Sequence, residues 1–140
     1  MKKTEELTLS VQGRNIEDAF SNAVPDLLSL MIDVNTIQHS VTKTLMIRSK
    51  DLKSLLHLYL KKSYDYAMSE ALLLSKVNNL AIESINDEYM LTANISGEKL
   101  NKSHKLNANI KQVKGRNILI KESKDGCNLQ INVVVEKDEV

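Results

Sequence analysis

The sequence has one cysteine, one proline, four glycines and no tryptophan among its 140 residues. Because Cys127 has no second cysteine to pair with, an internal disulfide is excluded. Neither a P-loop motif nor a G-x-G-x-x-G run is present, so the chain lacks the glycine-rich loops that bind phosphates through backbone N–H groups. We therefore expect no nucleotide and no organic cofactor.

Aromatic residues are also scarce, with one phenylalanine and four tyrosines. RNA-binding sheets stack bases on exposed aromatic side chains, and only Tyr89 falls on an expected strand, so direct base recognition is disfavoured. The 19 basic and 18 acidic residues leave a formal charge of +1, which gives no global field for nucleic acid. The interval 98–124 is locally basic, and it is either a solvated face or a contact surface for RNA or an acidic partner.

No stretch approaches the roughly 20 apolar residues that span a bilayer, and the apolar run 71–74 lies between Glu70 and Ser75. Residues 1–6 are charged where a secretory signal would be apolar. We expect a cytoplasmic protein with no membrane association. With 42% hydrophobic and 26% charged residues, the composition predicts one folded domain over residues 1–140.

Apolar periodicity predicts the elements of the first half. Leu7, Leu9 and Val11 alternate with polar residues, as in a half-buried strand that ends at Gly13. Asn15 is a suitable N-cap for a helix whose apolar positions continue as far as Met31. Because proline lacks an N–H, Pro25 predicts that this helix kinks or splits in two.

The remaining elements follow from the same patterns. They are a strand at 40–48, a helix that begins at Asp51, a hairpin around 86–88, a polar loop at 97–109, and a second hairpin of 118–121 with 129–135 around the Asp125-Gly126 dipeptide. This order predicts an α+β fold of two main helices packed against a mostly antiparallel or mixed β-sheet.

Few residues are candidates for chemistry. His57 lies beside the apolar stripe of the second helix, and the absence of paired Cys or His at ligand spacing favours a structural role. Cys127 follows a hairpin turn with no neighbouring base, so we interpret it as a small apolar or turn residue. No nucleophile is recognisable together with a base, and we expect no enzymatic activity.

An ordered series of motifs resembles the archease family over almost the whole chain. Residues 13–23 resemble that family's strand-turn-helix signature. Further matches are Leu30–Asp33 to its L-M-T-D, Asp51–Leu56 to its D-L-x-x-L-L, Gly97–Leu100 to its W-G-E-x-L, His104 to its loop histidine, and Ile110–Val113 to its V-K-A-V. The resemblance implies the archease α+β fold, in agreement with the order of elements above.

The resemblance also implies a function. Archease is an accessory protein of the GTP-dependent RNA-splicing (tRNA-splicing) ligase of the RtcB type, which it helps to become guanylylated and to turn over. The expected partner is therefore such a ligase, with RNA contact only indirect or weak. Two alternatives stay open: a degenerate paralogue that kept the fold and lost the activating site, and a chaperone-like binding module that acts on an RNA-modifying enzyme.

Two of the family's metal positions differ in this chain. The family's H-T-A-D, whose Asp is a metal ligand, aligns with Lys3–Glu6, and a second metal-binding Asp aligns with Glu136. Hard cations take oxygen ligands, so Glu6 and Glu136 are expected to bind Ca²⁺ or Mg²⁺ weakly if their strands are neighbours. The alternative is that both are solvated acids at strand ends.

The expected partner-binding surface is the polar segment Glu98–Arg116 together with the strand ends at Glu6 and Glu136. Within it we single out Glu98, His104 and Lys111, because Lys111 is retained from the family's V-K-A-V-T-Y run. Convergence of the two strand ends requires that residues 6–11 and 129–135 pair in one sheet.

Overall fold

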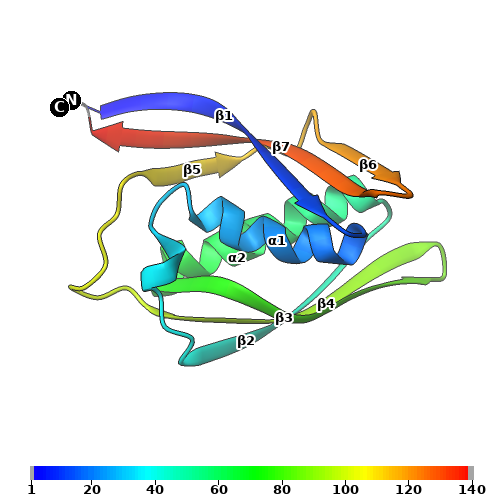
Figure 1. Ribbon diagram of the computed structural model, residues 1–140, viewed down its shortest axis with the longest axis horizontal. Helices are drawn as coiled ribbons and strands as arrows, with labels where there is room; N and C mark the ends of the chain where they lie inside the picture. The colour runs from blue at the N-terminus through cyan, green and yellow to red at the C-terminus, as the bar shows by residue number, and fades with distance from the viewer. Residues whose placement is uncertain (1, 139–140) are drawn as a thin grey trace.

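Two helices lie between two antiparallel β-sheets in the computed structural model, which describes residues 2–138 (Figure 1). The elements are β1 (Lys2–Gly13), α1 (Ile16–Leu28), the 3-10 helix η1 (Val34–Thr36), β2 (Val41–Ser49), α2 (Leu52–Glu70), β3 (Leu72–Ile85), β4 (Glu88–Lys99), β5 (Asn109–Val113), β6 (Leu119–Ser123) and β7 (Gly126–Asp138). The predicted α+β class with two main helices is confirmed. Residues 1, 139 and 140 of the predicted domain lie outside the described residues.

The strands form two sheets, whereas the sequence predicted one. One sheet has the order β1-β7-β5, with β6 also paired to β7, and the other has the order β2-β4-β3. The sheets cover opposite sides of the helix pair (Figure 1). Each sheet therefore buries one face against α1 and α2 and exposes the other, which accounts for the alternating apolar and polar residues along the strands.

The predicted pairing of residues 6–11 with 129–135 is confirmed. β1 pairs with β7 in an antiparallel register that sets Leu9 opposite Ile131 and Val11 opposite Leu129. All four of these side chains are buried. Because strand residues alternate between faces, the polar neighbours of these residues lie on the outer face of the sheet.

Helix α1 begins at its predicted cap and is continuous through Pro25, so of the two predicted outcomes, a kink or a split, the split is wrong; the helix ends at Leu28, before Met31. The Asn15 side chain accepts a hydrogen bond from the Asp18 backbone N–H at 2.8 Å. Val24 and Leu27, on either side of the proline, are both buried. We attribute the continuity of the helix to this packing, which holds its last turn despite the missing N–H.

The helices meet in the centre of the core. The Phe20 ring of α1 stacks on the Tyr59 ring of α2, with centroids 6.0 Å apart and an interplanar angle of 21°. Both side chains are fully buried. No helix within residues 2–138 is both long and apolar enough to cross a membrane.

The hairpins are confirmed, but the predicted polar loop at 97–109 begins too early. Gly97 and Glu98 belong to β4, and the loop that follows runs over residues 100–108. A Cβ on Gly97 would lie 1.7 Å from the Leu73 carbonyl oxygen, so this buried glycine allows β3 to approach closely. At the β3–β4 turn, Asn86 and Asp87 adopt φ angles of 51° and 64°, as type I′ hairpins require.

Candidate functional site

The two predicted metal-ligating residues converge at one end of the β1-β7-β5 sheet. β1 and β7 are neighbours, with Glu6 opposite Val134 and Thr4 opposite Glu136. Leu7 and Val135, the next residues along each strand, point toward the core, so Glu6 and Glu136 both lie on the outer face. They are diagonal neighbours on this face, as the predicted convergence required.

Each carboxylate has its own partners. Glu136 Oε1 lies 3.5 Å from the Lys2 ammonium nitrogen and 3.9 Å from that of Lys111. Glu6 Oε2 instead accepts a hydrogen bond from the Asn132 side-chain amide at 3.1 Å. The Asn132 amide oxygen in turn accepts from the Thr8 hydroxyl at 3.0 Å. The two carboxylates thus belong to separate contacts on the same face.

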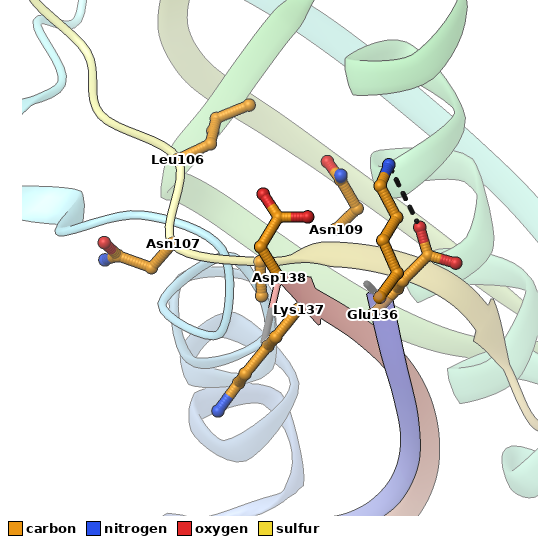
Figure 2. Close-up of a pocket in the computed structure, with 8 residues that line it drawn as sticks. Leu106, Asn107, Asn109, Glu136, Lys137 and Asp138 are labelled. Carbon is orange, nitrogen blue, oxygen red and sulfur yellow. Dashed lines mark ion pairs between the residues drawn. The ribbon is translucent and has the colours of Figure 1, made fainter. Parts of the chain in front are cut away.

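A small hollow joins this sheet end to the preceding loop. It has a volume of about 50 Å³ and is lined by Lys2, by residues 106–109 and by residues 136–138. Figure 2 shows Glu136 and Asp138 of β7 beside Asn109 of β5, with a dashed line for the ion pair between Lys2 and Glu136. The hollow is too small for an organic cofactor, since ligand pockets are usually several hundred Å³.

The side chains at this sheet end do not fit a divalent cation as they are placed. Ca²⁺ takes six to eight oxygen ligands, whereas residues 2–138 contain no group of three His, Cys, Asp or Glu side chains positioned to hold a metal. Glu136 faces two ammonium groups, which repel a cation, and Glu6 accepts from a donor amide. Weak Ca²⁺ or Mg²⁺ binding at Glu6 and Glu136 stays a prediction for calorimetry.

Glu98 and His104 form a contact that holds the 100–108 loop. His104 Nε2 lies 2.6 Å from Glu98 Oε1, and the His104 side chain has no exposed surface. The Asn101 backbone N–H donates to His104 Nδ1 at 3.0 Å, so the hydrogen of the neutral imidazole is on Nε2, which donates to Glu98. The backbone N–H of Gln38 also donates to Glu98, and this bond, followed by that from His104, holds the pKa of the Glu98 carboxyl below its usual range.

Backbone hydrogen bonds fix both ends of this loop. The Leu100 N–H donates to the Ala71 carbonyl, and the Asn107 N–H donates to the Met31 carbonyl, each at 2.7 Å. Because the His104 side chain is buried, Glu98 and His104 position the loop, whereas side chains such as Leu106 are exposed on it. Partner binding at Glu98 and His104 stays a prediction. The geometry favours an indirect role, in which these two residues hold the loop and its exposed side chains make the contact.

Lys111 is exposed on β5 at a break in the strand register. The pairing of β5 with β7 shifts between Ile110 and Gln112, and such bulges redirect side chains. The Lys111 side chain is 51% exposed and reaches Glu136. The predicted partner-binding lysine and the predicted metal-ligating acid are therefore in contact, a proximity that sequence periodicity did not indicate.

His57 makes an interior contact and Cys127 is buried, as their predicted structural roles require. His57 Nε2 is 3.0 Å from the Val113 carbonyl oxygen, so the ring joins α2 to the end of β5. A Cβ on Gly115 would lie 3.1 Å from the His57 ring, which shows how closely the β5–β6 connection packs there. Cys127 is buried at the start of β7, and burial raises the pKa of its thiol.

Comparison with known proteins gives consistent matches. The family model described as "Archease protein family (MTH1598/TM1083)" matches residues 3–135. The protein archease of Methanosarcina barkeri is 29% identical over 133 residues, 93% of this chain and 90% of that protein. Its counterpart in Methanosarcina mazei is 26% identical over 142 residues, 95% and 92% of the two chains. The solution structure of protein 1598 of Methanobacterium thermoautotrophicum matches with a TM-score of 0.76 and 22% identity over 96% of each chain, which shows a shared fold.

Proposed function

Because the chain belongs to the archease family, we propose that it is an accessory factor of a GTP-dependent RNA-splicing ligase, which it helps to become guanylylated and to turn over. The observation that carries this proposal is the family match over residues 3–135. In this role the chain acts by binding the ligase and performs no chemistry of its own.

The proposed contact surface combines the 100–108 loop with the sheet end at Lys111 and Glu136. These parts are continuous, because the loop leads directly into β5 and both line the hollow in Figure 2. Preorganisation supports the proposal, since a loop already held by His104 loses less conformational freedom on binding.

The chemistry of this surface suits a protein partner. Leu100 and Leu106 are each 39% exposed, and the loop also carries Lys102 and Lys105. Protein interfaces commonly combine an apolar centre with a charged rim. The lysines steer the surface toward an acidic face of the ligase, and this attraction weakens as ionic strength rises. Contact with RNA in this arrangement is indirect.

A guanylylation assay tests the proposal. The ligase encoded in the same genome is incubated with GTP, with and without the chain, and the fraction of guanylylated ligase is measured over time. We expect faster and more complete guanylylation with the chain. A heat-denatured sample of the same chain is the control, and equal rates in all three reactions would contradict the proposal.

The contacts of Glu136 with two lysines favour one second candidate, a paralogue that retains ligase binding and has lost activation. Such a paralogue would co-purify with the ligase and leave the guanylylation rate unchanged. The accessory factor would co-purify and raise the rate, so the two measurements together distinguish the candidates.

A further inference from the structure

We propose that the ammonium groups of Lys2 and Lys111 take the place of a divalent cation at the end of the β1-β7-β5 sheet, which makes this a metal-independent site. The proposal rests on the family membership and on the contacts of Glu136. It does not depend on the ligase partnership, because it concerns the isolated chain.

The first support is the convergence of two lysines on one carboxylate oxygen. β7 lies between β1 and β5, and each of these flanking strands contributes one lysine. Lys2 approaches Glu136 Oε1 to 3.5 Å and Lys111 approaches the same atom to 3.9 Å. The carboxylate is therefore contacted by positive charge from both neighbouring strands.

The second support is how the backbone directs these lysines. Lys2, Thr4 and Glu6 are every second residue of β1 and so lie on the same face of the sheet. Thr4 is the register partner of Glu136. On the other side, the irregularity between Ile110 and Gln112 leaves Lys111 outside the regular pairing. Lys2 is thus brought to Glu136 by the register of β1, and Lys111 by the irregularity in β5.

The third support is the charge balance. The resemblance implies two carboxylates and a divalent cation at this position in the family, whereas here two lysines contact Glu136 and Glu6 contacts Asn132 instead. Two ammonium groups carry the same total charge as one divalent cation. A divalent ion at Glu136 would have to displace both lysines or lie close to them, and either arrangement disfavours binding.

The fourth support is the engagement of the other carboxylate. Glu6 Oε2 accepts from the Asn132 amide, which is itself held by Thr8. The carboxylates therefore do not share a common point at which an ion would find several oxygen ligands. Both are satisfied by side chains of the chain itself.

Calorimetric titration of the EDTA-treated chain with Ca²⁺ and with Mg²⁺ tests the proposal. Three proteins are compared: the wild type, the variant Lys2→Gln/Lys111→Gln, and the control Lys3→Gln/Lys121→Gln. The control removes the same charge from exposed lysines of β1 and β6 that lie outside the Glu136 cluster. Circular dichroism melting without metal shows whether each protein is folded.

We expect the wild type and the control to bind Ca²⁺ no more tightly than a Kd of about 1 mM, the weak end of protein calcium sites. The Lys2→Gln/Lys111→Gln variant lacks the two positive charges that lie within about 4 Å of Glu136 and repel a cation there. This variant should therefore bind Ca²⁺ about tenfold more tightly, or more. A wild-type Kd below about 100 µM for either ion would overturn the proposal. An affinity of the variant equal to that of the control would also overturn it. If the double variant does not fold, Lys111→Gln alone is compared with Lys121→Gln by the same criterion.

Discussion

Replacing His104 with alanine should release the 100–108 loop while most of the fold stays intact. The imidazole has no exposed surface, donates to Glu98 and accepts from the Asn101 N–H. Its removal leaves a small cavity and takes one partner from each of these groups. The loop ends at Leu100 and Asn107 keep their two backbone hydrogen bonds, but lose the side-chain contact that joins the loop to Glu98.

The size of the effect follows from the burial of the groups that lose a partner. An unsatisfied buried polar group costs about 1–3 kcal/mol. Glu98 keeps its bond from the Gln38 N–H and Asn101 is exposed, so neither is left fully unsatisfied, and we take the net loss of the two hydrogen bonds as about 2 kcal/mol. For a domain of this size, that loss lowers the melting temperature by roughly 6–10 °C.

Hydrogen exchange and urea unfolding together separate the local effect from the global one. We expect the amides of Leu100 and Asn107 to exchange faster in the variant. The exchange rates of the amides in the β1–β7 ladder should rise only by the amount that the loss of global stability, measured by urea unfolding, explains. The control is Lys105→Ala, which removes an exposed side chain from the same loop and should change stability by less than about 0.5 kcal/mol. Exchange at Leu100 and Asn107 as slow as in the wild type, with an unchanged melting temperature, would refute the reasoning.

Three further predictions follow from single side chains. Hydrogen bonds lower the pKa of Glu98 in the folded state, so the ionised carboxylate stabilises the fold above the unfolded-state pKa of about 4.3, and this stabilisation is lost as pH falls through the lower folded-state pKa. The destabilisation caused by Glu98→Gln should therefore shrink below about pH 4 in melting curves. A difference in melting temperature between variant and wild type that does not change with pH would contradict this. The buried Tyr59 hydroxyl has no hydrogen-bond partner within residues 2–138, so Tyr59→Phe should leave stability unchanged or raise it by about 1 kcal/mol, and a lower melting temperature would show that the hydroxyl is satisfied. Lys111→Ala should reduce ligase activation and change stability by less than about 1 kcal/mol, because exposed ion pairs contribute little. Lys76→Ala on the opposite sheet is its control, and full activation by Lys111→Ala would place the contact elsewhere.

Local patterns were sufficient to predict most elements, whereas the convergence of Glu6 with Glu136 was predicted from the family resemblance. Alternation fixed which side chains of β1 face the core, and the Asn15 cap fixed the start of α1, because both depend on residues close in sequence. The division into two sheets depends on which strands pair over long distances. Periodicity shows that a strand has a buried face but does not identify the layer that it covers.

The parts of the site that were not predicted depend on irregular backbone and on long-range contacts. The register shift beside Lys111 has no signature in residue type, so the contact of this lysine with Glu136 could not be inferred. The extension of β4 through Gly97 depends on the close approach of Leu73 in the neighbouring strand. Likewise, the Glu98 carboxylate that His104 contacts also accepts from Gln38, 60 residues away, and residue spacing does not predict such a contact.

Multiple-turnover RNA joining by the cognate ligase measures the proposed accessory role most directly. The ligase is supplied with excess RNA ends and GTP, and the chain is added at a smaller molar amount than the ligase. We predict that each ligase molecule then joins many RNA ends, whereas joining without the chain stops early. The same amount of joined RNA per ligase with and without the folded chain would contradict the assignment of an accessory function.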